Sequence, residues 1–238
     1  MSSLADRYQA VQARIASACD RHGRNRADVQ LVVVSKFHPA SLVEELIDLG
    51  QTDFGENKDQ EASPKAAEVR AHLEALGRAQ DLPRWHFVGQ LQSNKVKSVL
   101  RYASTIHSLD RESLLTALNK EFAKDESLNP IGVFIELNLT DDPNRGGIHP
   151  DALLRFAEDV LKQPKLKLLG VMGVATLEGQ EERDFTRIKA ASESLQMLHP
   201  EASKISAGMS NDFELAIGFG ATHLRVGTAI TGPRQYLT

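Results

Sequence analysis

Short apolar segments alternate with longer amphipathic segments along the whole chain. Eight segments have the length and composition of buried β-strands, because they are rich in apolar or β-branched residues and several are followed by glycine. They cover residues 31–36, 52–55, 86–89, 105–110, 133–139, 168–173, 204–208 and 222–227. The segments between them have the apolar spacing of helices, and a further helix over residues 4–22 is predicted before the first strand.

Several predicted helix boundaries carry local signals. Ser41 and Glu44 have the spacing of a capping box, and Gly50 would end the same helix. Asp110 is placed to cap the helix after the fourth strand, and Pro150 suits the first turn of the helix after the fifth. These signals support a regular alternation of strands and helices.

Eight strands, each followed by a helix, predict a single (β/α)8 TIM barrel over residues 1–238 with an extra N-terminal helix. An open, doubly wound sheet of eight strands is the alternative. No segment marks a domain boundary, and 238 residues is a common length for a barrel of one domain.

The composition limits the classes of function. Hydrophobic residues make up 41% and charged residues 25%, which is ordinary for a globular protein, and the net charge of -4 comes without a basic stripe that would indicate nucleic-acid binding. The one cysteine, Cys19, permits neither an internal disulfide nor a cysteine-based metal site and suits a reducing cytosol. The N-terminus lacks an apolar signal core, and no apolar run approaches the roughly 20 residues of a membrane helix. We therefore expect a cytoplasmic protein without a nucleic-acid or membrane partner.

The first predicted strand ends in a lysine. Because side chains alternate along a strand, Lys36 shares a face with Val32 and Val34. If these valines point into the barrel, Lys36 stands at the barrel mouth, where active sites lie and where a desolvated amine is a nucleophile for carbonyl groups. The other interpretation is a lysine that reaches solvent or pairs with a carboxylate such as Glu56.

The loops after the last two strands have the features of a phosphate site, which TIM barrels commonly place there. Gly208 and Gly227 would allow backbone N–H groups to approach an anion closely. Ser210 can donate its hydroxyl and cap a helix over residues 211–219, and Thr228 adds a second hydroxyl. The alternative is that the small residues only turn the chain.

Arg225 interrupts the apolar part of the eighth strand. A guanidinium inside a barrel needs an acceptor, and the pyridine nitrogen of pyridoxal 5′-phosphate (PLP) is one that arginine or aspartate usually contacts. An internal salt bridge with Glu136 or Asp212 is the alternative. The three features together describe PLP: an aldehyde for the lysine, a phosphate for the two hydroxyls and a ring nitrogen for the arginine.

The chain also resembles the pyridoxal phosphate homeostasis protein family, whose members are relatives of the alanine racemase barrel. The matching stretches are VVVSK (32–36), FGENKDQE (54–61), WHFVGQLQSNKVK (85–97), IHSLD (106–110), LNLTDDPNRGGI (137–148), GVMGVAT (170–176) and GMSNDFELAIGFGATHLRVGTAITG (208–232). The resemblance implies a fold-type III PLP-binding barrel with PLP as a Schiff base (aldimine) on Lys36. It further implies a phosphate held by Ser210, Gly227 and Thr228, a pyridine nitrogen facing Arg225, and a cofactor lined by Asn57 and Met209.

We expect a PLP carrier without catalytic residues rather than an enzyme. A permanently charged Arg225 would leave the ring nitrogen unprotonated and weaken the ring as an electron sink. The chain ends at Thr238, soon after the last barrel helix would begin, so we expect it to lack the extra domain that supplies the second base of the racemases. The resemblance implies a role in intracellular PLP (vitamin B6) homeostasis, in which a monomer holds PLP and delivers it to apo PLP-dependent enzymes or to free amino acids.

Two other functions stay open. One is a PLP-dependent amino-acid racemase-like enzyme with weak activity, with His86 or His38 as the second base. The other is a Schiff-base aldolase, in which Lys36 attacks the carbonyl of a sugar phosphate without PLP.

Three remaining features are less specific. The basic segment over residues 92–97 is predicted to begin a helix, and it is either a solvated face or a partner-binding surface. His107 and His223 are expected to be packed or capping residues, since no spacing of histidine and carboxylate residues indicates a metal site.

Overall fold

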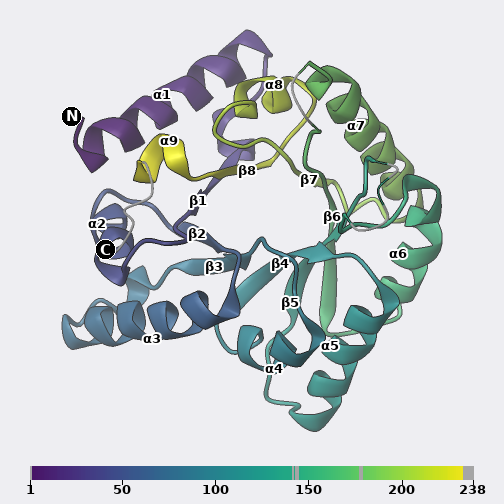
Figure 1. The fold of residues 1–238 in the computed structure, drawn as a ribbon, viewed down its shortest axis with the longest axis horizontal. Helices are drawn as coiled ribbons and strands as arrows, with labels where there is room; N and C mark the ends of the chain where they lie inside the picture. Colours follow the sequence, from purple (N-terminus) through teal and green to yellow (C-terminus); the bar gives the residue numbers. More distant parts are fainter. Residues whose placement is uncertain (1, 141, 143–144, 177–178, 233–238) are drawn as a thin grey trace.

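The computed structural model describes residues 2–140, 142, 145–176 and 179–232. In this part of the chain, eight parallel strands form a closed barrel in sequential order, as Figure 1 shows. The strands are β1 (Gln30–Val34), β2 (Asp53–Glu56), β3 (Arg84–Phe87), β4 (Ala103–Leu109), β5 (Ile131–Glu136), β6 (Leu166–Met172), β7 (Lys204–Ser206) and β8 (His223–Val226). The predicted barrel is confirmed and the open sheet is wrong, because β1 pairs with β8 from Gln30–His223 to Val33–Val226.

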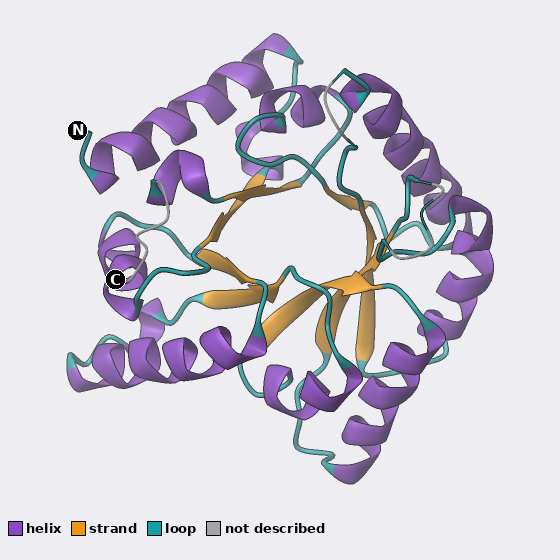
Figure 2. Cartoon of the chain, in the orientation of Figure 1, coloured by secondary structure: helices purple, strands orange, loops and turns teal. Residues whose placement is uncertain are grey.

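A layer of helices surrounds the strands (Figure 2). The α-helices are α1 (Leu4–Arg21), α2 (Ala40–Asp48), α3 (Asp59–Ala75), α4 (Val96–Val99), α5 (Glu112–Lys124), α6 (Leu153–Leu161), α7 (Glu181–Leu198), α8 (Phe213–Gly218) and α9 (Thr228–Thr231). Short 3-10 helices are η1 (Arg26–Asp28), η2 (Ala79–Asp81), η3 (Ser93–Lys95) and η4 (Pro150–Ala152). The basic segment 92–97 begins a helix as predicted, since η3 continues into α4. Among the described helices, none is both long and apolar enough to cross a membrane.

The predicted N-terminal helix, α1, completes the helical layer where the last two helices are short. Helices α8 and α9 have six and four residues, whereas α1 has 18. Helix α1 packs against both of them (Figure 1), and its buried face includes Tyr8, Val11 and Ile15. The three helices together therefore close the wall beside β8 and β1.

Two predicted helix caps are wrong. Helix α2 has Pro39 at its N-cap position, so Ser41 is already helical and cannot form the capping box. Helix α5 has Arg111 at its N-cap position, and the Asp110 carboxylate accepts a hydrogen bond from the Arg111 guanidinium instead of capping the helix. The observed N-cap lies two residues before Ser41 in α2 and one residue after Asp110 in α5.

Two other boundary signals are confirmed. Gly50 follows the end of α2 with a φ of 90°, in the left-handed region that favours glycine. Pro150 begins η4, which leads directly into α6.

The strands direct alternate side chains to the helical layer and to the barrel interior. Leu31 and Val33 belong to the core between barrel and helices. Val32 and Val34 point inward as predicted, because a methyl group on Gly55 would lie 3.1 Å from Val32 Cγ1 and 3.3 Å from Val34 Cγ2. Buried polar side chains share this interior, namely Asp53, His86, His107, Ser206, His223 and Arg225.

Candidate functional site

Lys36 lies in a tight turn after β1, at the carboxyl-terminal mouth of the barrel. The strand ends at Val34, so Lys36 stands two residues beyond the strand rather than inside it. Its Nζ atom is 5.8 Å from the centroid of the Phe37 ring. Phe37 has a φ of 67°, which is uncommon for a residue with a side chain, and its N–H donates to Glu61 Oε2 at 3.2 Å. This strained turn fixes the backbone that carries Lys36.

Glu56, which the alternative interpretation offered as a partner of Lys36, is paired with a different lysine. Glu56 Oε1 accepts hydrogen bonds from Lys65 Nζ at 2.5 Å and from Ser35 Oγ at 2.8 Å, and Lys65 Nζ also donates to Ser35 O at 2.9 Å. Burial raises the pKa of Glu56, and the charge of Lys65 opposes the rise. The network anchors Ser35 directly before Lys36 and gives Glu56 a lysine partner other than Lys36.

Ser210, Gly227 and Thr228 come together between the ends of β7 and β8. Ser210 Oγ accepts hydrogen bonds from Thr228 Oγ1 at 3.3 Å and from the Ala229 N–H at 3.4 Å. The predicted capping of α8 by Ser210 is therefore wrong, because Asp212 holds the N-cap position of α8. Two hydroxyls and a backbone N–H thus gather where the sequence predicts a phosphate.

Two glycines shape these loops. Gly208 has a φ of 90°, and a methyl group on it would lie 2.8 Å from Ala216 Cβ. A methyl group on Gly227 would lie 3.3 Å from Val34 O, so the loop after β8 runs close to the end of β1. Met209 follows Gly208 and is 38% exposed, which places its side chain at the surface of the mouth.

Arg225 is buried in the barrel interior with two hydrogen bonds. Its Nη1 donates to Ser206 Oγ at 2.5 Å and its Nη2 donates to Gly173 O at 3.0 Å. Burial lowers the pKa of Arg225 to about 10, so the guanidinium remains charged at neutral pH. The salt bridge considered as an alternative does not form, since neither Glu136 nor Asp212 pairs with Arg225 in the described part of the chain.

Asn57 follows β2 and carries a buried acceptor. Its Oδ1 atom has no hydrogen-bond partner among the described residues. An unpaired buried acceptor costs about 1–3 kcal/mol, which a ligand donor at the mouth would offset. Gly89 on the neighbouring strand end makes room for this loop, because a methyl group there would overlap the Asn57 carbonyl oxygen.

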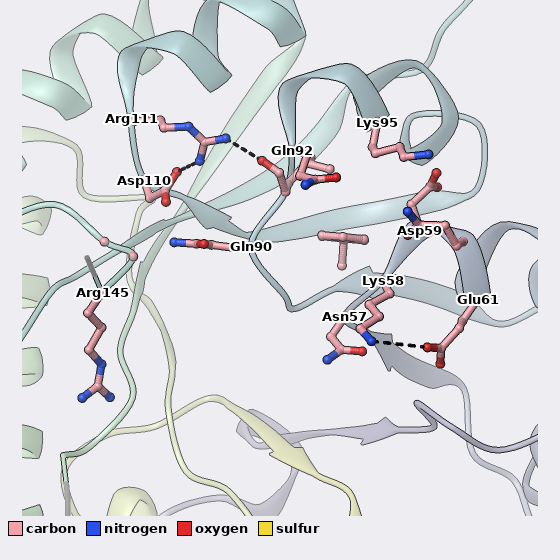
Figure 3. A pocket seen from close by; sticks show the side chains of 15 residues that line it. Asn57, Lys58, Asp59, Glu61, Gln90, Gln92, Lys95, Asp110, Arg111 and Arg145 are labelled. Atoms are coloured by element: carbon pink, nitrogen blue, oxygen red, sulfur yellow. Dashed lines mark hydrogen bonds and ion pairs between the residues drawn. The ribbon is translucent and has the colours of Figure 1, made fainter. Parts of the chain in front are cut away.

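A cavity of about 900 Å³ opens beside Asn57, over the ends of β2 to β5. Figure 3 shows its lining of amides, cations and carboxylates, which includes Asn57, Lys58, Asp59, Glu61, Gln90, Gln92, Lys95, Asp110, Arg111 and Arg145. Asn57 is the predicted site residue that lines it, and the other six lie on β1, β7 and β8 or in the loops that follow them. The barrel mouth is therefore divided between the predicted cofactor residues and a wide polar cavity.

Two supporting contacts, Lys65–Glu56 and Ser206–His107, are absent from the sequence prediction. Lys65 has no local signal of burial, because a lysine in an amphipathic helix is ordinarily exposed, and its partner is reached only in the folded barrel. Ser206 and His107 alternate inward on their strands, which marks them as interior residues, but their contact with each other depends on barrel closure. No group of histidine, cysteine and carboxylate residues in the described part of the chain is arranged to hold a metal ion.

Comparisons with known proteins show the family of the chain. The family model "Alanine racemase, N-terminal domain" matches residues 7–235. Pyridoxal phosphate homeostasis proteins of Mycobacterium leprae and Escherichia coli are each 37% identical to the chain. The alignment with the Mycobacterium leprae protein covers 98% of this chain and 94% of the relative. The alignment with the Escherichia coli protein covers 99% of each. The solved structure of PipY from Synechococcus elongatus with PLP bound has 29% sequence identity and a TM-score of 0.76, covering 93% of this chain and 100% of PipY. The chain therefore belongs to the pyridoxal phosphate homeostasis protein family, within the alanine racemase N-terminal domain fold.

Proposed function

We propose that this protein binds PLP at the barrel mouth, holds it through Lys36 and delivers it in intracellular PLP homeostasis. One observation carries the proposal: the Ser210 and Thr228 hydroxyls lie 3.3 Å apart after β7 and β8, and β8 pairs directly with β1, which leads to Lys36. The phosphate donors and the amine therefore stand on neighbouring strand ends. The PLP found in PipY supports the same ligand for this chain.

The residues of the mouth fit the parts of PLP. When bound, PLP supplies an aldehyde that condenses reversibly with a primary amine and releases water, and Lys36 Nζ would provide that amine. Ser210 and Thr228 would donate to the phosphate, with Gly227 keeping the loop close to β1. Asn57, with its unpaired buried oxygen, and the exposed Met209 would line the cofactor.

Arg225 favours a carrier over a racemase-like enzyme. Its charged guanidinium would donate to the pyridine nitrogen and leave that nitrogen unprotonated, which weakens the ring as an electron sink. The two histidines considered as a second base are also committed elsewhere. His86 bonds to Asp53 and His107 inside the barrel, and His38 is buried, with a pKa lowered by burial and nearby cations.

Delivery needs only an exchange of amines. An acceptor amine, from an apo PLP-dependent enzyme or a free amino acid, would form a bond to the aldehyde carbon while the bond to Lys36 Nζ breaks. Both N–H protons of the neutral acceptor amine would pass to the departing Lys36 nitrogen, which leaves as a free amine, so no oxidant or reductant is required. We expect the whole chain, residues 1–238, to act in this way as one PLP-binding domain and as a monomer.

Lys36 and Lys58 provide a matched test, because their Nζ atoms lie 5.8 and 5.5 Å from the same Phe37 ring. Lys36→Ala should lose the absorbance band of lysine-bound PLP while keeping the circular dichroism of the fold, and Lys58→Ala should keep the band. Borohydride reduction followed by peptide mass spectrometry should find the PLP mass on Lys36. The PLP mass on another lysine alone, or an unchanged band in Lys36→Ala, would contradict the assignment.

The carrier role is tested by measuring the transfer of PLP to an apo enzyme and the exchange of the α-deuterium of an added amino acid. The loaded protein should reactivate an apo PLP enzyme and should not exchange the α-deuterium of an amino acid above background. An exchange rate that depends on Lys36 would support the racemase-like enzyme instead.

A further inference from the structure

A continuous chain of buried hydrogen bonds crosses the barrel interior from β2 to β8. Asp53 Oδ1 lies 3.0 Å from His86 Nε2, and His86 Nδ1 lies 2.9 Å from His107 Nε2. His107 Nδ1 lies 2.7 Å from Ser206 Oγ, which in turn accepts from Arg225 Nη1 at 2.5 Å. All five side chains are buried. The chain thus links the amino-terminal end of the barrel to the arginine of the proposed PLP site.

The direction of the first two bonds follows from Asp53. Although burial would raise it, hydrogen bonds from His86, Arg84 and Thr52 hold the pKa of Asp53 well below its ordinary value, so Asp53 is an ionised acceptor. His86 must therefore carry a proton on Nε2. A histidine that carries a single proton, on Nε2, accepts at Nδ1; in this form of His86, the His107 ring donates to it from Nε2.

The direction of the last two bonds follows from His107. Complete burial and the charge of the neighbouring Arg225 hold the pKa of His107 well below its ordinary value, so the ring carries a single proton; with that proton on Nε2, its Nδ1 accepts. Ser206 then donates its hydroxyl proton to His107 and keeps only lone pairs for Arg225. Because a guanidinium has donors alone, this orientation satisfies every bond of the chain.

We propose that His107 and Ser206 are positioning residues, which hold Arg225 as a fixed, charged donor toward the pyridine nitrogen of PLP. The proposal rests on the proposed function, since it assumes that the ring nitrogen lies beside Arg225. Ser206 acts by direct contact with the guanidinium, and His107 acts by fixing the direction of the Ser206 hydroxyl. Asp53 and His86 set the direction of the whole chain.

His223 offers a matched control for His107. Both rings are buried, their centroids lie 6.1 Å apart, and both contact the Phe134 ring, at 4.6 Å from His107 and 5.0 Å from His223. His223 Nδ1 bonds to Thr222 Oγ1 and does not join the chain. His107→Met and His223→Met therefore lose similar packing, but only the first interrupts the hydrogen bonds to Arg225.

The first measurement uses PLP-free protein. Long-range 1H–15N NMR of the histidine rings should find His107 neutral with its proton on Nε2. A proton on Nδ1, or a charged ring, would overturn the proposed direction even if Lys36 is the PLP lysine. The measurement is therefore independent of the proposed function.

The second measurement uses PLP labelled with 15N in the ring. His107→Met should weaken PLP binding about tenfold, because Arg225 would no longer be held in position to donate its charged hydrogen bond to the ring nitrogen. The same variant should shift the ring-nitrogen resonance of bound PLP. His223→Met should leave the affinity within about threefold and the resonance unchanged, which corresponds to loss of packing alone. Equal effects of the two variants would overturn the positioning role, while PLP on another lysine in the Lys36 experiment would instead overturn the proposed function.

Serine variants keep the test valid if His107→Met does not fold. Ser206→Ala removes the acceptor of Arg225, and Ser192→Ala removes a fully buried hydroxyl on α7, outside the barrel. Ser206→Ala should reproduce the loss of affinity and the shifted resonance, whereas Ser192→Ala should not. An unchanged resonance in Ser206→Ala would contradict the proposal.

Discussion

Replacement of Lys65 by methionine should strongly destabilise the fold, because it leaves the Glu56 carboxylate buried without its partner. The two side chains are 7% and 0% exposed, and Lys65 Nζ lies 2.5 Å from Glu56 Oε1. Removal of one member of a buried ion pair costs about 3–5 kcal/mol, because the remaining charge is uncompensated. The loss of packing is small, since methionine matches most of the lysine stem.

The pH dependence of this loss can be worked out from Glu56. In Lys65→Met the carboxyl group can take up a proton, which from its ordinary pKa of 4.5 costs about 3.4 kcal/mol at pH 7 and about 0.7 kcal/mol at pH 5. The lost hydrogen bond to Ser35 O adds about 1 kcal/mol, giving about 4 kcal/mol at pH 7 and about 2 kcal/mol at pH 5. The sign follows because the folded variant binds a proton that the unfolded chain releases above pH 4.5, so its stability falls as pH rises.

Urea unfolding of wild type and Lys65→Met at pH 5 and pH 7 measures both values. The double variant Lys65→Met with Glu56→Gln removes the buried charge and should lose the pH dependence. Equal destabilisation of Lys65→Met at the two pH values, or a loss below about 1 kcal/mol at pH 7, would refute the reasoning.

Three further predictions follow from the same structure. Ser210→Ala combined with Thr228→Ala should weaken PLP binding about a hundredfold or more in an equilibrium titration, because two hydroxyl donors to a charged group are lost. Gly208→Ala should cost about 2–4 kcal/mol in urea unfolding, whereas Gly179→Ala should cost about 1 kcal/mol, since both have φ near 90° but only Gly208 would also bring a methyl group against α8. Burial raises the pKa of Glu136 to about 7, so the group binds a proton on folding, and the stability of the fold decreases as pH rises from about 4.5 to 7. Glu136→Gln should remove up to about 3 kcal/mol of that decrease. An unchanged curve of stability against pH would contradict this prediction.

The barrel was predictable because each strand and helix carries its own pattern, and because strand alternation fixes which side chains point inward. Val32 and Val34 show this: the strand period of two places both valines inside, whereas Lys36 follows in the turn after the strand. The caps were not predictable in the same way. Ser41 and Asp110 carry adequate local signals, but the folded helices start two residues before the first and one residue after the second, and a shift of this size is enough to remove a cap.

The contacts that support the site depend on register, which no local pattern contains. Lys65 reaches Glu56 only because α3 packs back on the strand that precedes it, and Ser206 reaches His107 only across the closed barrel. Neither contact can be inferred from the positions of its two residues in the sequence. The proposed PLP-binding residues were therefore predictable from strand ends and family likeness, while the contacts that support them needed the structure.

The charge of Arg225 connects these supporting contacts to the choice between carrier and enzyme. A pKa of about 10 leaves the guanidinium charged over the physiological range, although burial opposes the charge. Hydrogen bonds to Ser206 and the Gly173 carbonyl compensate the charge without supplying a negative partner. A carboxylate at this position would instead favour a protonated ring nitrogen and hence carbanion chemistry. In the proposed site, an arginine whose two hydrogen bonds go to neutral acceptors would present a charged donor to the ring nitrogen, which favours the carrier over the racemase-like enzyme.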